Sequence, residues 1–468
     1  MQGDQVNEIV AKVLARVRGG EIPQHEVDVP GAPRGVFKTV DAAMDAAAHA
    51  QLTLMAMPLE KRREIIGNIR KRAAEDVHSL AKLALDETGL GRYEDKIKKN
   101  LLVIHKTPGP EILEPIAYTG DDGLTLIERA PYGVMGSITP CTNPTETIIN
   151  NGIGMVAAGN TVVFNTHPAA KKTSAYCIDL INKASIEVGG PENLMNCVES
   201  PTIASANEVM THKTTAMVVV TGGGEVVRAA MNSGKKCVAA GPGNPPVVVD
   251  ETADIDLAGR GIVRGASFDN NVICTDEKEV LVVEKVADKL LAVMKDEGAV
   301  ILRNHQITRL EKLILTPDRE HINRSWVGQD AAKMLREIDV PFSGDPRLIV
   351  CEVPFSHPFV QLELLMPVIG VVRVPDVHQA IDLALEAEHG FRHTASMYSR
   401  NLDSLHRMAC VMNCSIFVKN APNYAGLGFG GEGYTSFTIA SPTGDGLTTA
   451  RTWTRERRCT LAGYFRIV

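Results

Sequence analysis

Residues 216–234 read AMVVVTGGGEVVRAAMNSG, an apolar run that passes through three glycines into a helix-forming stretch. A strand that leads directly into a helix is the first half of a βαβ unit, the building block of parallel sheets. Glycines at this junction allow a backbone to approach a phosphate closely, and a helix N-terminus favours the anion. The run lacks the spacing of the GxGxxG fingerprint, so a tight structural turn stands as the alternative to a nucleotide site.

Similar apolar stretches flank this unit on both sides and alternate with helical ones. They are GVMGSI (133–138), TVVF (161–164), VVV (247–249), EVLVVE (279–284) and VIGVVRV (368–374). This alternation predicts an α/β fold class with parallel sheets.

Two further stretches complete the outline of the chain. Pro58 stands where a helix begins, and apolar residues recur at helical spacing from there as far as Asp86. The last 30 residues are rich in Thr, Gly and Arg, which predicts an arm outside the core.

Composition narrows the class of protein. The chain has 468 residues, 44% of them hydrophobic, enough for two or three domains with sizeable cores. It carries 49 Lys+Arg against 56 Asp+Glu, a formal net charge of −7, which argues against nucleic-acid binding. Nine cysteines without a CxxC pair indicate reduced thiols in the cytoplasm. No run approaches the ~20 apolar residues of a membrane span, so we expect no membrane contact.

The first residues form a separate amphipathic unit. Residues 4–18 (DQVNEIVAKVLARVR) place valines, isoleucine and leucine on one helical stripe, and Gly19 and Gly20 end it. The proline-containing stretch that follows is a linker by composition. This helix either folds back on its own body or docks onto another protein.

The segment FDNNVIC at 268–274 ends in the cysteine whose surroundings set it apart from the other eight. Cys274 follows two asparagines and precedes Thr275 and Asp276. Small and amide-bearing residues can hold a thiol and a backbone N–H at an open turn, and a thiolate is the strongest common nucleophile near neutral pH. The other cysteines are read as small buried hydrophobes.

A second group of residues has side chains that could bind a metal, although a metal site is the less favoured interpretation. His406, Cys410 and Cys414 recur at i, i+4 and i+8 along an expected helix. Tetrahedral zinc needs a fourth ligand and a different spacing, so helix packing is the preferred explanation and no metal is expected. The chain also lacks HExxH, GxxxxGK[ST] and GxSxG motifs.

Taken in order, the motifs resemble the aldehyde dehydrogenase superfamily over residues 36–468. The matching segments are ERAPYGVMGSITPCTNPTET, AAGNTVVFNTHPAA, VVVTGGG, GPGNPPVVV, FDNNVIC, ELLMPV (363–368), HGFRHTASMYSRNLD (389–403), FGGEG and PTGDGLTTARTWTRERR. The resemblance implies an aldehyde dehydrogenase-like α/β fold with a Rossmann-type nucleotide-binding domain, an α/β catalytic domain and a small β oligomerisation arm. It also implies a homo-dimer or homo-tetramer.

The resemblance also implies domain limits. They are residues 1–20 for an encapsulation-type helix, 21–35 for the linker, 36–117 and 132–243 for the NAD/CoA-binding domain, 244–436 for the catalytic domain, and 118–131 with 437–468 for the arm.

Carried over to this sequence, the family pattern implies a catalytic role for Cys274 as the nucleophile. The amide that helps to hold the oxyanion is expected at Asn143, with Thr142 as the alternative register. His393 in FRHTA is a candidate base for the thiol of an acyl acceptor, coenzyme A, with a structural role as the alternative. Ile273 and Thr275 are candidate walls of a pocket for a short aliphatic aldehyde.

The cofactor-binding residues implied for NAD come from several segments. They are Thr221, Gly222, Gly223 and Gly224 beside the pyrophosphate, Glu363 on the nicotinamide ribose, and Pro140 and Asn165 in the neighbouring strand ends.

One departure from the family pattern bears on the reaction. The position of the glutamate that activates water in hydrolytic members is Ala239. The chain is therefore similar to the coenzyme A-acylating propionaldehyde and acetaldehyde dehydrogenases of bacterial microcompartments, in which coenzyme A takes the acyl group. That likeness implies a shell protein as the partner of residues 4–18 and a location in the microcompartment lumen. A hydrolytic dehydrogenase and a non-enzymatic interaction protein remain as alternatives.

Overall fold

The computed structural model describes residues 33–468. The helix predicted at 4–18 and most of the linker after it lie outside the described residues. From Arg34 to Val468 the chain forms one compact unit.

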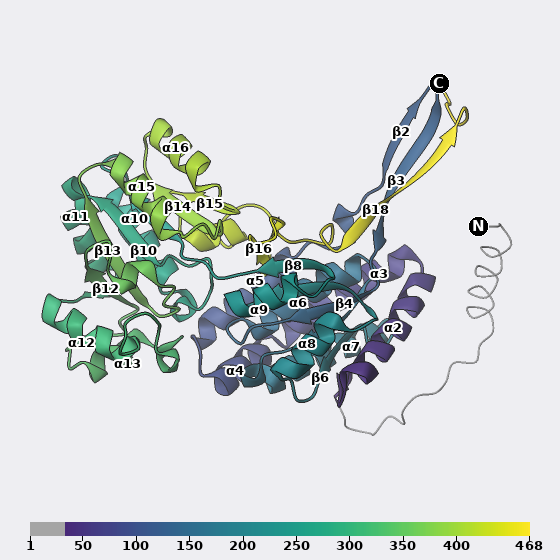
Figure 1. Cartoon of the computed structure of the whole chain (residues 1–468), viewed down its shortest axis with the longest axis horizontal. Coiled ribbons are helices and arrows are strands. Elements are labelled where there is room, and N and C mark those ends of the chain that lie inside the picture. Colours follow the sequence, from purple (N-terminus) through teal and green to yellow (C-terminus); the bar gives the residue numbers. More distant parts are fainter. Residues whose placement is uncertain (1–32) are drawn as a thin grey trace. The chain divides into compact units, whose positions relative to one another are not determined.

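The helices follow the sequence in the order shown in Figure 1. They are α2 (Val40–Ala56), α3 (Leu59–Glu75), α4 (Val77–Thr88), α5 (Tyr93–Lys106), α6 (Pro144–Ala157), α7 (Lys171–Glu187), α8 (Ile203–Thr211), α9 (Gly224–Met231), α10 (Ile255–Ala266), α11 (Glu284–Asp296), α12 (Asn304–Ile314), α13 (Ala331–Glu337), α14 (Pro358–Gln361), α15 (Val377–Ala387) and α16 (Leu402–Met412). The short 3-10 helices are η1 (Pro110–Ile112), η2 (Pro168–Ala170), η3 (Phe268–Asn271), η4 (Arg324–Trp326) and η5 (Asn423–Leu427).

The strands alternate with these helices. They are β1 (Val36–Phe37), β2 (Ile116–Gly120), β3 (Gly123–Pro131), β4 (Val134–Ile138), β5 (Thr161–Asn165), β6 (Met195–Val198), β7 (Thr215–Thr221), β8 (Lys236–Ala240), β9 (Pro246–Val249), β10 (Glu279–Val283), β11 (Ala299–Ile301), β12 (Leu348–Glu352), β13 (Val368–Val374), β14 (Thr394–Tyr398), β15 (Ile416–Lys419), β16 (Ile439–Ala440), β17 (Gly446–Leu447) and β18 (Thr454–Ala462). Each apolar stretch singled out in the sequence is a strand.

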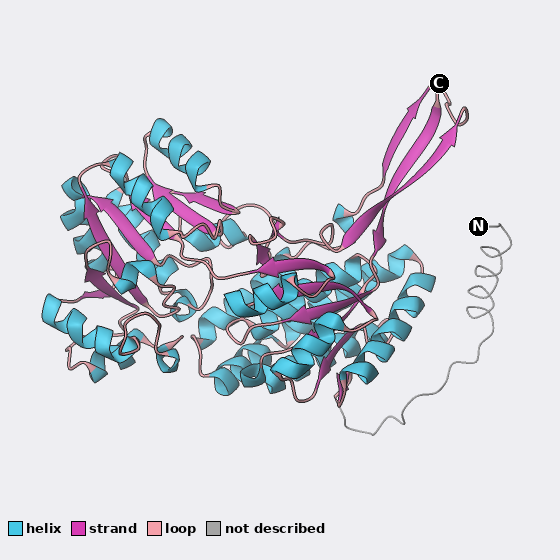
Figure 2. Cartoon of the chain, in the orientation of Figure 1, coloured by secondary structure: helices cyan, strands magenta, loops and turns pink. Residues whose placement is uncertain are grey.

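Two large sheets carry the fold, and Figure 2 shows them with helices around each. The first has the order β1-β6-β5-β4-β7-β8 and the second the order β11-β12-β13-β10-β9-β14-β15. All strand pairs within both sheets are parallel. The α/β class predicted from the alternation of strands and helices is confirmed.

Helices cover both faces of the first sheet, so its inner strands β4, β5 and β6 are buried throughout. Because side chains alternate along a strand, Val218 joins one apolar cluster with residues of α2 and α8, whereas Met217 and Val219 join another with residues of α3, α6 and α7. This double coverage explains why the strands appear in the sequence as unbroken apolar runs.

The face predicted between Pro58 and Asp86 is divided between two helices. α3 ends at Glu75 and α4 begins at Val77, with Asp76 between them. Ile65, Ile69 and Leu80 are buried in the same core cluster, so the break redirects the chain without interrupting the apolar face.

A third, antiparallel sheet has the order β18-β3-β2 and appears as a separate ribbon in Figure 1. β18 is exposed from Arg455 onward. The expectation that the end of the chain avoids the core is correct for this strand but wrong for the residues before it. Trp453, Ala450 and Ile439 are buried in the core cluster of the first sheet.

Candidate active site

The first group of predicted residues lies where strand order reverses in the first sheet. β4 has β5 on one side and β7 on the other, and ligands of open parallel sheets bind outside the carboxyl ends of strands at such a switch point. Pro140 and Asn143 follow β4, Asn165 ends β5, and Thr221 ends β7. These sequence-predicted residues therefore share one edge of the sheet.

The glycine turn at this edge leaves its backbone open. A Cβ added at Gly223 or Gly224 would meet nothing within 4 Å, whereas one at Gly222 would meet the Val226 side chain at 2.9 Å. Gly223 caps α9, whose first amides are directed at the sheet edge. An exposed backbone at a helix N-terminus fits a pyrophosphate group such as that of NAD.

Two hydroxyl and amide side chains beside this turn are tied to the fold. Thr221 Oγ1 lies 2.9 Å from Thr438 Oγ1. Asn165 is buried, and its Oδ1 accepts a hydrogen bond from Ser205 Oγ at 2.6 Å. Both residues therefore fix the position of the strand ends.

The second group lies in the second sheet, at the edge formed by the amino-terminal ends of its strands, whereas the first group lies at a carboxyl-terminal edge. β13, β10, β9 and β14 are neighbours and parallel, so the loops that precede them meet at one amino-terminal edge. Glu363 precedes β13, Cys274 precedes β10, Gly243 precedes β9, and His393 precedes β14. The fold brings together residues that are 150 positions apart in sequence.

Gly243 lies at the centre of this second group. A Cβ at this position would approach His393 Cγ to 2.9 Å and the Cys274 carbonyl oxygen to 3.0 Å. Its backbone N–H donates to Glu363 Oε1 at 3.4 Å. A larger residue at 243 would push the thiol loop and the histidine apart.

Desolvation controls the ionisation of the Cys274 thiol. Desolvation, with a smaller contribution from Glu363, raises the pKa of Cys274 to about 12. Lys278 opposes this shift, because its positive charge favours the thiolate. Its buried ammonium is held by hydrogen bonds to the Ile273 carbonyl at 3.1 Å and to Asn271 Oδ1 at 2.5 Å. The thiol at pH 7 is therefore protonated, and its reaction needs a proton acceptor.

Burial also changes the charge of two neighbours. It raises the pKa of Glu363 to about 7, against the opposing effect of Lys278. It lowers the pKa of His393 to about 4, so the imidazole is neutral at pH 7. His393 Nδ1 lies 2.9 Å from Thr394 Oγ1, and Nε2 has no hydrogen-bond partner among residues 33–468.

The loop before Cys274 has an unusual backbone. Asp269, Asn270 and Asn271 are three consecutive left-handed residues, with φ of 46°, 56° and 63°, a conformation that Asn and Asp tolerate better than most residues. Asn271 Nδ2 donates to the Ala266 and Glu277 carbonyls. Such strain persists where surrounding contacts fix it, and it is common at functional sites.

The two residues that flank the thiol are packed into the protein. Ile273 and Thr275 are buried, and the Thr275 carbonyl accepts from Asn423 Nδ2 at 2.9 Å. Cys274 between them is partly exposed. The two predicted pocket walls thus hold Cys274 in place, and their contact with a substrate stays a prediction.

Comparison with known proteins gives a matching family model, described as aldehyde dehydrogenase family, over residues 22–444. The chain belongs to the aldehyde dehydrogenase family. It is 46% identical to the acetylating acetaldehyde dehydrogenase EutE of Salmonella typhimurium, with all of both chains covered. The family predicted from the ordered motifs is confirmed.

Solved structures agree with this assignment. A propionaldehyde dehydrogenase from the fucose utilisation bacterial microcompartment of Clostridium phytofermentans superposes with a TM-score of 0.91 at 46% identity, covering 93% of this chain and 100% of that one. A propionaldehyde dehydrogenase from Rhodopseudomonas palustris, solved with bound CoA and an acylated cysteine, gives a TM-score of 0.90 at 46% identity, covering 92% and 98%.

In this aldehyde dehydrogenase, His406, Cys410 and Cys414 do not lie on one helix. α16 ends at Met412, so Cys414 lies beyond it, and its Sγ contacts the Ile416 carbonyl at 3.0 Å. His406 and Cys410 are one turn apart and exposed, with Sγ 3.8 Å from Nε2.

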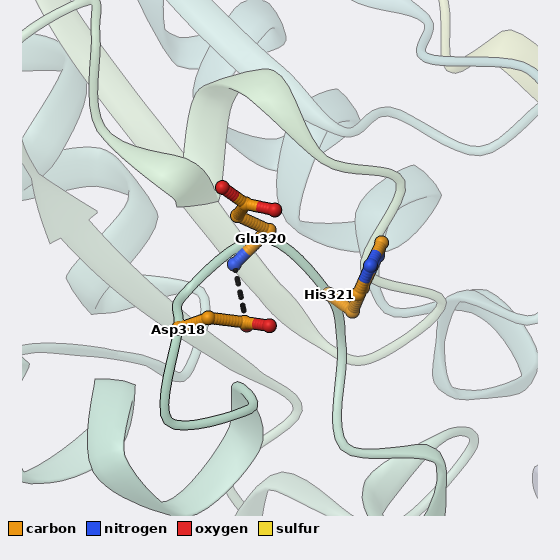
Figure 3. A group of neighbouring side chains, drawn as sticks. All are labelled: Asp318, Glu320 and His321. Atoms are coloured by element: carbon orange, nitrogen blue, oxygen red, sulfur yellow. Dashed lines mark hydrogen bonds between the residues drawn. The ribbon is translucent and has the colours of Figure 1, made fainter.

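A different group of potential metal ligands stands on a surface turn of the aldehyde dehydrogenase after α12. Figure 3 shows Asp318, Glu320 and His321, whose ligand atoms lie within 4.8 Å of one another. All three are exposed, and Asp318 Oδ1 accepts the Glu320 N–H at 3.0 Å as part of the turn. We assign no ligand to them. Among residues 33–468, no helix has both the length and the apolar character to span a membrane.

Sequence analysis missed several polar residues that support the site in this aldehyde dehydrogenase. Lys278 is four residues after Cys274 in the run TDEKE, and its proximity to the thiol was a usable signal. Lys99 contacts Asn143 and Asp269 from α5. No local pattern connects these three positions, because they come from separate elements.

Proposed function

We propose that this aldehyde dehydrogenase oxidises a short aliphatic aldehyde, with propionaldehyde favoured, to its acyl-coenzyme A thioester. The observation that carries the proposal is that Cys274 and a neutral His393 both border Gly243, while Ala239 occupies the position that holds the water-activating glutamate in hydrolytic members. Ala239 is fully buried in β8. Its methyl side chain has no basic group, so it supplies no base for hydrolysis. The relatives named for acetylating activity and for bound CoA support the same reading.

The open glycine turn of Gly222, Gly223 and Gly224 would hold the cofactor phosphates, and Glu363 would bind the nicotinamide ribose. When bound there, NAD+ supplies the hydride acceptor. Asn165 and Pro140 would shape the edge on which it lies.

The thiol proton of Cys274 passes to the neutral imidazole of His393 and from there to solvent. The resulting thiolate attacks the aldehyde carbon and forms a thiohemiacetal. The Cys274 backbone N–H and Asn143 Nδ2 hold the developing oxyanion, and one such donor contributes about 3 kcal/mol. Loss of hydride leaves a thioester on Cys274. The neutral imidazole of His393 accepts the proton of the coenzyme A thiol, which then displaces Cys274 and releases acyl-coenzyme A. Oxidation of the aldehyde to an acyl group on Cys274, followed by transfer of that group to coenzyme A, implies ping-pong kinetics.

We expect NADH formation from propionaldehyde to stop after one turnover when coenzyme A is absent and to continue when it is added. The physical reason is that Cys274 stays acylated without a thiol acceptor. Stopped-flow absorbance of NADH measures both phases on the full-length chain. Sustained turnover without coenzyme A would instead make the enzyme hydrolytic.

We further propose that residues 4–18 dock onto a microcompartment shell protein and that the enzyme resides in the cytoplasm, within the microcompartment lumen. The apolar stripe of this segment supports the proposal, and the microcompartment origin of a similar structure agrees with it. The exposed sheet of β2, β3 and β18 supports assembly into a homo-dimer or homo-tetramer.

Deletion of residues 1–20 is expected to leave coenzyme A-dependent turnover unchanged and to remove co-purification with shell proteins. Leu14→Glu on the apolar stripe should act like the deletion, whereas Lys12→Glu on the polar side should not. Pull-down with tagged shell protein measures the association. A large loss of turnover in the deletion variant would assign the segment to the catalytic fold instead.

A further inference from the structure

Four charged side chains are completely buried between α5, α6 and η3. Lys96 and Lys99 come from α5, Glu146 from α6 and Asp269 from η3, and the side chain of each is 0% exposed. Asp269 Oδ2 lies 2.5 Å from Lys99 Nζ and 3.1 Å from Lys96 Nζ, and Glu146 Oε1 lies 3.3 Å from Lys99 Nζ. We call these residues the buried charge cluster. It connects the helices of the first sheet to the loop that carries Cys274.

Lys99 makes one contact outside this cluster. Its Nζ donates to Asn143 Oδ1 at 2.6 Å. An ammonium group has donors and no acceptor, so this contact requires the amide oxygen to face Lys99 and Nδ2 to face away. Asn143 Nδ2 donates to Thr142 Oγ1 at 3.2 Å, which uses one of its two hydrogens.

We propose that Lys99 is a positioning residue that fixes the Asn143 amide, so that the second Nδ2 hydrogen is held for the oxyanion formed on the aldehyde. The inference deepens the proposed function and rests on it, because it concerns the same reacting oxygen. A side-chain amide without such a partner has two orientations, and one of them directs an oxygen lone pair at the oxyanion. The lysine removes the unproductive orientation before the substrate binds.

The charge on Lys99 is maintained by its two carboxylates. Desolvation acts to lower the pKa of Lys99, but Asp269 and Glu146 more than offset it, and the pKa lies above its usual value. For Lys96, desolvation outweighs Asp269, and the charge of Lys99 adds to it, so its pKa is lowered. Lys99 therefore holds the more strongly bound proton, as a fixed donor to Asn143 requires.

Lys96 provides a matched control on the same helix. It is as deeply buried as Lys99 and pairs with the same Asp269 oxygen, but its hydrogen bond goes to Asp269 and not to Asn143. Methionine has a side chain of nearly the same length as lysine. Substitution of either lysine by methionine therefore removes one buried ammonium and keeps most of the packing. The two variants differ in their effect on the Asn143 amide, because only Lys99→Met removes the donor to Asn143 Oδ1.

The test compares Lys99→Met and Lys96→Met in the full-length chain. Stopped-flow NADH bursts measure the acylation rate, and aldehyde KM is measured in the same preparations. We expect Lys99→Met to lower the burst rate by roughly tenfold to a hundredfold, since loss of a whole oxyanion donor costs about 10² to 10³. Aldehyde KM should change less than threefold, and Lys96→Met should lower the burst rate less than threefold. Equal losses in the two variants would overturn the proposal.

A double-mutant comparison separates positioning from support of the fold. If Lys99 acts through Asn143, Lys99→Met should cost little in a chain that already carries Asn143→Ala. Losses that multiply would show that Lys99 acts by another route. Lys99→Gln, which keeps an N–H donor for Asn143 Oδ1, should recover part of the burst rate.

A variant that leaves both lysines in place covers the case in which Lys99→Met does not fold. Asn143→Asp keeps an oxygen acceptor for Lys99 but has no Nδ2, so in folded protein, verified by circular dichroism, the burst should fall by about 10² or more. A burst within threefold of wild type would overturn the proposal. The wild-type burst in the same assay tests the proposed function separately, because its absence would contradict that function whatever the variants do.

Discussion

Cys274→Ala is expected to abolish NADH formation, with a loss on the order of 10⁴-fold or more, because removal of a nucleophile eliminates covalent catalysis. Both half-reactions pass through this sulfur, so the burst and the steady state should disappear together. Stopped-flow NADH absorbance measures the loss, and intact-protein mass spectrometry of the wild type without coenzyme A should show one retained acyl group.

The chain offers a matched control for this substitution. Cys141 is a second partly exposed thiol, in the loop between β4 and α6, and burial raises its pKa. Cys141→Ala should lower turnover less than tenfold and retain the acyl adduct. An adduct that persists in Cys274→Ala would move the nucleophile to another residue.

Asp269→Asn is expected to lower the free energy of unfolding by about 3–5 kcal/mol, since it leaves two buried ammonium groups facing an amide. The native Asp269 carboxylate also accepts a hydrogen bond from the backbone N–H of Arg92 at 2.6 Å. Urea unfolding followed by circular dichroism measures the change. Asp330→Asn, which removes a half-exposed partner of Arg92, should cost only about 0–1 kcal/mol.

The pH dependence of Asp269→Asn has a defined sign. Asp269 opposes the desolvation that lowers the pKa of Lys96, so its replacement by Asn lowers the folded-state pKa of this lysine further. Between that pKa and the value of about 10.4 in the unfolded chain, the unfolded state binds more protons, so the stability of the variant rises with pH in this window. A loss of stability that does not change between pH 7 and 10 would indicate a packing defect instead of buried charge.

The strands were predictable because both sheets are covered on both faces, so that burial appears directly as apolar runs such as AMVVV. The position of the glycine turn followed from the same pattern. The helix α5 shows a case in which hydropathy along the chain does not predict burial. Its segment YEDKIKKNLL has the composition of a surface helix, yet Lys96 and Lys99 are fully buried. Their burial depends on carboxylates from other elements, which hydropathy along the chain does not contain.

The C-terminal residues show a second limit. Thr, Gly and Arg dominate this stretch, so composition predicts an exposed arm, which is correct for β18. Trp453 is nevertheless packed against the first sheet, where its backbone carbonyl accepts a hydrogen bond from Asn160 Nδ2 at 2.8 Å. One large apolar residue in a polar stretch has little weight in a composition argument, although its burial anchors the segment.

The buried charge cluster also bears on the order in which the protein can be completed during synthesis. Lys96 and Asp269 are separated by 173 positions, and the whole first sheet is made before Asp269 leaves the ribosome. Until then Glu146 is the single carboxylate of the cluster available to two ammonium groups. The amino-terminal half therefore reaches its final packing only when the nucleophile loop arrives, and an unfinished chain cannot present a finished catalytic centre.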